Sequence, residues 1–246
     1  MTSNHSFLSS INPTIKLITH LLLMFLLMAV TNPLTTLAVW IFVLIMGISI
    51  GGWKLPFLVK VLLPYLFLFI FVFWMRAAFG IGEHVIMEWA WFRITEESLR
   101  NGLTISLRML GFVTIGLLYT STTDLNLFIM SLIQQCKLSP KWAYGFLAGF
   151  RCIPMFQEEL AQIKEAHRIR GYKYTGSWRA FRRYAVPLLT QAIRRSERMA
   201  IAMEARGFTG TRDRTYYRSP IVSKQDYVYL AVVLMIAVVL LFTVKN

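Results

Sequence analysis

Residues 57–79 read FLVKVLLPYLFLFIFVFWMRAAF, and this run decides what kind of protein the chain is. Its only charged residues, Lys60 and Arg76, lie toward the two ends. About 20 apolar residues in a helix are enough to cross the hydrocarbon core of a bilayer. The run therefore predicts a membrane-spanning helix, and Pro64 inside it predicts a kink.

Comparable apolar runs occur elsewhere in the chain, at residues 15–30, 34–50, 102–119 and 227–244. Hydrophobic residues make up 56% of the sequence and the mean hydropathy is +0.55. Soluble domains usually have only about 45–50% apolar residues, even with glycine counted. The sequence therefore predicts an all-α integral membrane protein with about five transmembrane helices, four of them before a long basic region and one after it.

The positive charge of the chain is concentrated in one region. The whole sequence of 246 residues has a net charge of +14, and residues 137–218 alone hold 17 lysine and arginine residues against six acidic ones. Lysine and arginine near membrane spans are retained on the cytoplasmic side. This rule predicts a multi-pass protein of the cell membrane with residues 137–218 in the cytoplasm and the acidic stretch 80–101 outside.

The basic region is predicted to be helical. Residues 124–135 form a short helix capped by Thr123 or Asp124, and longer helices follow at 142–169 and 180–206. We expect the two longer helices to be interrupted near Pro154 and Pro187. The region also carries leucine, isoleucine, methionine and phenylalanine at helical spacing, which favours packing helices over a nucleic-acid-binding surface.

These observations divide the chain into three parts, and the lipid bilayer is the first partner that they imply. Residues 1–120 are predicted to hold transmembrane helices one to four, residues 121–218 the cytoplasmic helices and residues 219–246 the last transmembrane helix. The helix at 180–206 is amphipathic. It can lie on the inner membrane surface, or it can pack on its sister helix and present its end to a partner.

Two phrases in the basic region repeat one pattern, alanine, three residues, arginine, glycine. They are Ala166 to Gly171, with Arg170, and Ala202 to Gly207, with Arg206. Glycine suits the left-handed position just past a helix, so each arginine is predicted in a last helical turn, on the same face as its alanine. A guanidinium fork beside a small residue matches a carboxylate in a groove. The alternative is that each phrase only ends a helix.

Several kinds of chemistry have no motif in this sequence. There is no Gly-Lys-Ser or Gly-Lys-Thr, so the phosphate-binding loop of P-loop ATPases is absent. The four histidines are scattered, and Cys136 and Cys152 do not have the spacing of metal ligands. We therefore expect a protein that is not an enzyme and that has no cofactor and no metal site of its own.

Arg108 lies within the apolar run at 102–119. An ionisable residue inside a membrane span is a candidate functional residue. The alternative, which we favour, is that its side chain faces the helix bundle or reaches toward the membrane surface.

The sequence resembles the transmembrane T component of energy-coupling factor transporters, the group that includes the cobalt- and biotin-uptake T proteins. The phrases that carry the resemblance are Asn12-Pro13-Thr14-Ile15-Lys16, Asn32-Pro33-Leu34, Thr122-Thr123-Asp124-Leu125, Arg151-Cys152-Ile153-Pro154 with Glu158-Glu159, and the two Ala-x-x-x-Arg-Gly phrases. Asn12 replaces the aspartate of the family, and Cys152 stands where an apolar residue is usual. Neither departure touches the paired Ala-x-x-x-Arg-Gly signature.

The resemblance implies a role as a coupling subunit. In that family the T component links two cytoplasmic ATPase subunits to a small membrane subunit that binds the substrate, a vitamin or a transition metal ion. Carried onto this chain, Arg170 and Arg206 would each enter a groove on one ATPase. Ala166, Gly171, Ala202 and Gly207 would allow the close approach. ATP hydrolysis would belong to the partner subunits.

Two other classes of function stay open at this point. A self-contained permease or channel would need polar residues along several spans, or broken helices in inverted repeats. The first three apolar runs carry almost no charge, which argues against this alternative. A membrane-anchored enzyme would need a catalytic group that the sequence does not offer.

Overall fold

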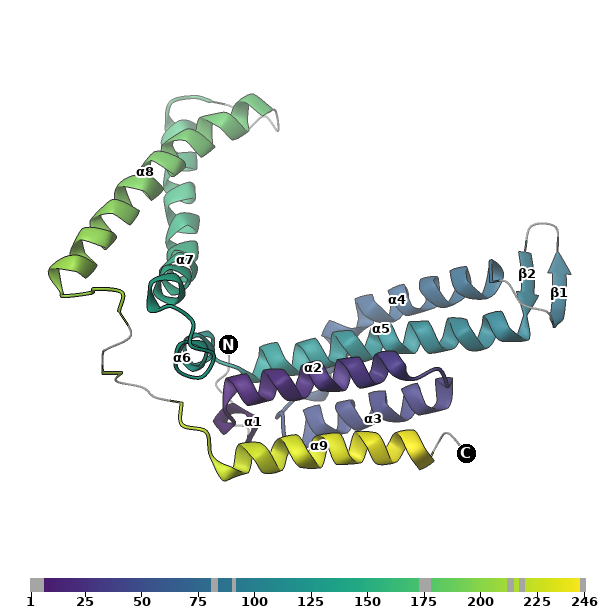
Figure 1. Ribbon diagram of the computed structural model, residues 1–246. Helices are drawn as coiled ribbons and strands as arrows, with labels where there is room; N and C mark the ends of the chain where they lie inside the picture. The colour runs from purple at the N-terminus through teal and green to yellow at the C-terminus, as the bar shows by residue number, and fades with distance from the viewer. Residues whose placement is uncertain are drawn as a thin grey trace. The chain divides into compact units, whose positions relative to one another are not determined.

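The computed structural model describes residues 7–80, 84–89, 92–172, 178–211, 215–216 and 220–243, and these residues are almost entirely helical (Figure 1). The chain forms two compact units. The first consists of residues 1–131 and 220–246, and the second of residues 132–219. The predicted fold class, an all-α integral membrane protein, is confirmed.

The first unit contains five apolar helices and a short N-terminal helix, α1 (Phe7–Ser10). The five are α2 (Pro13–Ala29), α3 (Pro33–Ser49), α4 (Leu55–Ala78), α5 (Glu96–Thr122) and α9 (Lys224–Thr243). Among the described residues, α4, α5 and α9 are long and apolar enough to cross a membrane. The apolar helices α2 and α3 have 17 residues each, at the short end of the range of about 17–25 for spanning helices.

Short local motifs begin these helices where the sequence changes from polar to apolar. Asn12 and Asn32 cap α2 and α3, each followed by a proline that needs no helical donor at the first position. The side chain of Thr95 accepts the N–H of Ser98 at 3.1 Å, and the hydroxyl of Ser98 accepts the N–H of Thr95 at 3.1 Å. This reciprocal cap starts α5 at Glu96, six residues before the apolar run that predicts the helix.

α5 is the central helix of the first unit. It packs against α2, α3 and α4, while α9 packs against α2 and α3. Its buried residues Ile115 and Leu118 join Leu27, Val43 and Ala237 in one hydrophobic core. In contrast, only 6% of the apolar stretch of α4 is buried, so most of α4 is left to contact lipid.

A β-hairpin connects α4 and α5. Strands β1 (Val85–Trp89) and β2 (Phe92–Thr95) pair antiparallel, and Figure 1 shows them beyond the ends of both helices. The sequence pattern predicts only a connecting stretch here. The strands are four or five residues long, and one charged residue, Glu88 or Arg93, interrupts the apolar pattern of each, so their periodicity is weak.

The second unit is built on two long helices, α7 (Pro140–Ile169) and α8 (Trp178–Ala205). α6 (Leu125–Gln134) precedes them. Asp124 lies just before α6, and its carboxylate accepts the N–H groups of Asn126 and Leu127 at 2.7 and 3.2 Å. Asp124 is thus the cap, one of the two residues predicted.

The predicted interruptions at Pro154 and Pro187 are wrong, because α7 and α8 continue through both prolines. α4 also continues through Pro64, and the kink predicted there stays a prediction. A proline removes one backbone donor, and the helical bonds on either side are enough to keep each segment continuous.

Candidate docking site at two helix tips

The end of α7 has the geometry of a Schellman motif. Gly171 adopts a φ of +79°, which is in the left-handed region. Its N–H donates to the carbonyl of Arg168 at 3.0 Å, and the N–H of Tyr172 donates to the carbonyl of His167 at 3.1 Å. These two bonds satisfy carbonyls that a helix end leaves unpaired, and they fix Arg170 as the last residue before the turn.

The end of α8 repeats this geometry. Gly207 also has a φ of +79°, its N–H donates to Glu204 at 2.9 Å, and the N–H of Phe208 donates to Met203 at 2.9 Å. Arg206 therefore occupies the same place as the arginine of the first tip. The repeat that the sequence contains is a repeat of backbone structure as well.

Both tips present the predicted residues on the surface. In each tip the arginine N–H donates to the alanine carbonyl one turn earlier, at 3.3 Å in both cases. The structure thus places each alanine and its arginine one helical turn apart at the end of one helix. The residues exposed at the two tips are Ala166, Arg170, Gly171, Ala202, Arg206 and Gly207.

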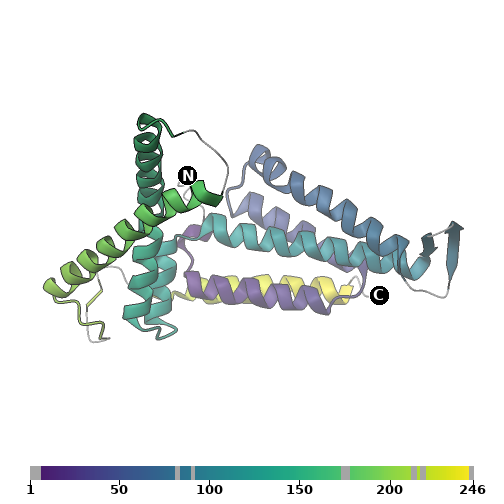
Figure 2. The same cartoon turned by 90° about the horizontal axis from the view of Figure 1, so that it is seen from above.

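The two tips lie far apart because α7 and α8 are antiparallel and cross (Figures 1 and 2). His167 packs edge-on against Tyr184 with ring centroids 5.5 Å apart, and at the other end Tyr144 packs against Phe208 at 5.5 Å. Tyr144, beside the second tip, precedes Arg170 by 26 positions along α7. At about 1.5 Å per residue, the stretch of α7 between the two tips is about 39 Å long. Such a distance suits two separate contacts.

An ion pair joins the middle of the two helices. The guanidinium of Arg195 in α8 contacts the carboxylate of Glu159 in α7, and both side chains are partly buried. Glu159 is the second residue of the Glu158-Glu159 phrase, and the sequence predicts no partner for it. The pair gives the crossing a polar contact between otherwise apolar faces.

The residue that follows each glycine is held differently at the two tips. The ring of Tyr172 packs against His167 at 5.5 Å, and the guanidinium of Arg183 lies 4.2 Å from its centroid, within cation–π range. At the second tip Phe208 packs on Tyr144. Both tips are therefore anchored, each by its own aromatic contact.

Substitution of the tip glycines gives the first prediction. Gly171→Val or Gly207→Val should destabilise the tip by about 1–2 kcal/mol, because a β-branched residue is strained at this φ. Thermal unfolding of the purified chain and binding of its partners would both be measured. Gly116→Ala is the control, since a Cβ at that helical position of α5 meets nothing within 4 Å. Equal behaviour of the control and the tip variants would contradict the assignment of strain to the tips.

α7 has an exposed apolar face, which the expectations from the sequence do not include. Trp142, Phe146 and Phe150 follow one another at intervals of four residues and are at least half exposed. Gly145 and Gly149 lie between them and line the same shallow apolar hollow. The spacing was a readable signal, since residues four apart share a helix face. We call this surface, residues Trp142, Gly145, Phe146, Gly149 and Phe150, the α7 apolar face.

A buried polar junction in the first unit is also missed. Lys16 is only 1% exposed, and its ammonium donates to the carbonyl of Thr122 at 3.1 Å and reaches the hydroxyl of Thr123 at 3.5 Å. Asp226, at the start of α9, accepts the backbone N–H of Asn12 at 2.8 Å. This junction joins the start of α2, the end of α5 and the start of α9.

Arg108 faces the helix bundle, as the favoured alternative predicts. Its guanidinium donates to the carbonyl of Val30 at 2.5 Å, at the point where α2 has just ended. A cation at a helix C-terminus is favoured by the helix dipole. This contact gives Arg108 a structural role in closing α2.

In the part of the chain that the structure describes, no three His, Cys, Asp or Glu side chains come together in a way that could hold a metal ion. The exposed tips carry arginine, alanine and glycine, and the α7 apolar face carries large aromatic side chains.

Comparison with known proteins agrees with this arrangement. The family model described as "CbiQ: Cobalt transport protein" matches residues 4–217. An energy-coupling factor transporter transmembrane protein EcfT of Staphylococcus aureus (strain 04-02981) is 32% identical, over 96% of this chain and 92% of the relative. The EcfT of Exiguobacterium sibiricum is 34% identical over 69% of this chain and 70% of its own length. That of Bacillus subtilis (strain 168) is 28% identical over 96% and 94%. The chain therefore belongs to the CbiQ cobalt transport protein family, as a transmembrane T component of an energy-coupling factor transporter.

Proposed function

We propose that the chain couples two cytoplasmic ATPase subunits to a small substrate-binding membrane subunit, and so drives uptake of a vitamin or a transition metal ion. The observation that carries the proposal is the duplicated tip, with one exposed arginine at the end of α7 and one at the end of α8. ATP hydrolysis belongs to the partner ATPases, and the choice of substrate belongs to the membrane subunit.

The geometry of the tips supports docking to two ATPases. Each arginine lies beside a glycine and one turn from an alanine, so a groove can close around the guanidinium without meeting a bulky neighbour. The guanidinium fork pairs best with a carboxylate in such a groove. Because the stretch of α7 between the tips is about 39 Å long, one chain can engage two subunits at once.

The α7 apolar face supports docking of the membrane subunit. Three large aromatic residues at four-residue spacing are exposed there, with glycines between them. Large exposed apolar patches mark sites of contact with proteins or membranes. Since α7 also carries the first tip, a movement of the ATPases reaches this face through one continuous helix.

The charge distribution supports a cytoplasmic position for residues 137–218. This assignment places the four transmembrane helices of residues 1–120 and the last transmembrane helix, within residues 219–246, in the cell membrane, with residues 121–218 as the coupling region. Reagents that label lysine only from outside intact cells should therefore spare Lys141 and Lys164.

Co-purification tests the proposed function. The tagged chain, extracted in mild detergent, should bring down two ATPase chains and one small membrane protein per complex. Native mass spectrometry would count the subunits and identify the membrane protein. Recovery of the chain alone from cells that contain all the partners would contradict the proposal.

A charge on the α7 apolar face should weaken binding of the membrane subunit but not binding of the ATPases. Phe146→Glu is expected to lower recovery of the membrane subunit at least tenfold, because a carboxylate would have to be buried among aromatic residues. Recovery of the ATPases should not change. Val186→Glu, at an exposed apolar position of α8, is the control. Loss of the ATPases together with the membrane subunit would show that Phe146 acts on the whole fold.

A further inference from the structure

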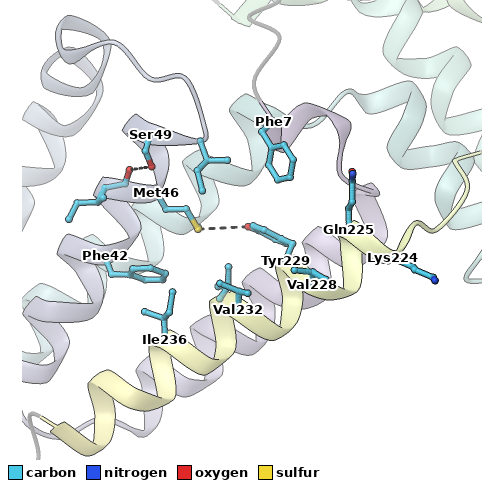
Figure 3. Close-up of a pocket in the computed structure, with 13 residues that line it drawn as sticks. Phe7, Phe42, Met46, Ser49, Lys224, Gln225, Val228, Tyr229, Val232 and Ile236 are labelled. Carbon is cyan, nitrogen blue, oxygen red and sulfur yellow. Dashed lines mark hydrogen bonds between the residues drawn. The ribbon is translucent and has the colours of Figure 1, made fainter.

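An apolar groove runs along the first unit between α3 and α9 (Figure 3). Its volume is about 450 Å³. Tyr229 and Met46 are buried at its floor, where the hydroxyl of Tyr229 lies 4.0 Å from the sulfur of Met46. We call this hollow the α3–α9 groove, lined by Phe42, Ile45, Met46, Val228, Val232 and Ile236.

The walls of the α3–α9 groove are open to the surroundings. Ile45 and Val228 are 58% and 60% exposed, and both belong to helices of the membrane-spanning unit. Apolar side chains that line a groove on such a surface meet lipid chains. The groove therefore opens toward the hydrocarbon of the bilayer.

One end of the groove is polar. Lys224 and Gln225 line this end, at the start of α9 (Figure 3). Lys224 is exposed, and its ammonium stands at a helix N-terminus, where the dipole also favours an anion. The hydroxyl of Ser49, a third polar group that lines the groove, already donates to the carbonyl of Ile45 at 2.7 Å. Lys224 lines this end of the groove, and Figure 3 shows its side chain directed away from the groove, toward the surroundings where a lipid headgroup would lie.

The length of the groove matches one leaflet of a bilayer. From Lys224 to Ile236 the lining of α9 covers 12 residues, or about 18 Å. Half of a hydrocarbon core of about 30 Å is about 15 Å. A polar head at Lys224 would therefore lie at the membrane surface, with the tail reaching the midplane near Ile236.

The groove is long and apolar. Its volume of about 450 Å³ extends over about 18 Å of α9, which leaves room for an extended hydrocarbon chain along its length.

We propose that the α3–α9 groove binds one acyl chain of an anionic glycerophospholipid, whose phosphate pairs with the ammonium of Lys224. Lipid selection comes from the charge at the polar end, while the apolar walls accept any chain of suitable length. The bound lipid fills the space between α3 and α9 beside the core residues Met46 and Tyr229. The proposal depends on the membrane-spanning unit alone, and not on docking of ATPases.

Photolabelling of the intact chain in vesicles tests the proposal. The vesicles contain phosphatidylcholine and a small fraction of phosphatidylglycerol with a diazirine at the end of one acyl chain. After illumination, peptide mass spectrometry should find the label concentrated on Phe42 and Ile236. An equal spread over the exposed residues of α4, such as Phe67 and Phe71, would mean ordinary contact with surrounding lipid and would overturn the proposal.

Charge reversal at the polar end tests the pairing with phosphate. Lys224→Glu should lower labelling of Phe42 and Ile236 by phosphatidylglycerol at least fivefold, and should leave labelling by the matching phosphatidylcholine probe unchanged. Lys54→Glu is the control, because Lys54 is also exposed in the first unit but does not line the groove. Equal labelling of the Lys224→Glu variant and the native chain would refute a role for Lys224.

Filling the groove gives an independent test. Val232→Trp should reduce labelling of Phe42 and Ile236 by both lipid probes, whereas Val239→Trp, on an exposed part of the same helix, should not. Unchanged labelling with Val232→Trp would overturn the proposal. Protection of Phe42 and Ile236 by a co-expressed membrane partner would assign the groove to a protein and overturn it as well.

Discussion

Arg170→Ala combined with Arg206→Ala is expected to abolish both recovery of the ATPase subunits and transport. Removing one partner of a charge pair buried in an interface costs about 2–5 kcal/mol, which is roughly 30-fold or more in affinity for each tip. Each single variant should keep one contact and bind the ATPases more weakly. Co-purification from mild detergent and uptake by whole cells measure the two effects.

The chain offers a matched control for this variant. Arg168 and Arg198 are exposed arginines of the same two helices that do not occupy the tip position, and Arg168 already lies 3.6 Å from Glu165. Alanine at both should leave assembly intact. Lysine at positions 170 and 206 should rescue only in part, because a point charge does not reproduce a two-pronged fork. Normal transport by the double alanine variant would rule out docking through the tips.

Lys16→Met is expected to lower the stability of the membrane-spanning unit. The ammonium is buried and donates to the carbonyl of Thr122, the last residue of α5. A hydrogen bond from a charged donor contributes about 1.5–3 kcal/mol, and its loss leaves a buried carbonyl unpaired. For a chain of this size the melting temperature should fall by roughly 3–12 °C. Tryptophan fluorescence during heating in detergent would measure the change.

Lys60→Met is the control for the buried lysine. It removes the same charge and adds the same side chain, but Lys60 is exposed on α4. Asp226→Asn is a second variant of the junction, because an amide cannot accept the N–H groups of both Asn12 and Ser223 as the carboxylate does. Melting of Lys16→Met within a degree of Lys60→Met would show that the junction does not stabilise the unit.

The sequence was sufficient to predict the structure wherever the structure depends on residues that are neighbours along the chain. The apolar runs predicted all five long apolar helices, because crossing a bilayer sets only a length and a composition. The tips were predicted because a Schellman motif needs one glycine and about six residues before it. Gly171 and Gly207 adopt the same φ for this local reason.

Local sequence patterns could not predict the polar junction. Asn12 and Asp226 are 214 positions apart, and no periodicity connects them. Lys16 was visible as one charge in an apolar run, but its partner at Thr122 depends on how α2 packs against α5. The predictions at the two prolines were wrong for the opposite reason. A local rule predicted breaks at Pro154 and Pro187, and the helical bonds around them held.

The two tips share one backbone but have different surroundings. Around the first lie His167, Tyr172 and Arg183, whereas the second has Phe208 on Tyr144. Under the proposed function, the chain would therefore present unlike surfaces to its two ATPase partners. Even two ATPases of identical sequence would become inequivalent on binding it. The two ATPases would then differ in how tightly they bind the chain.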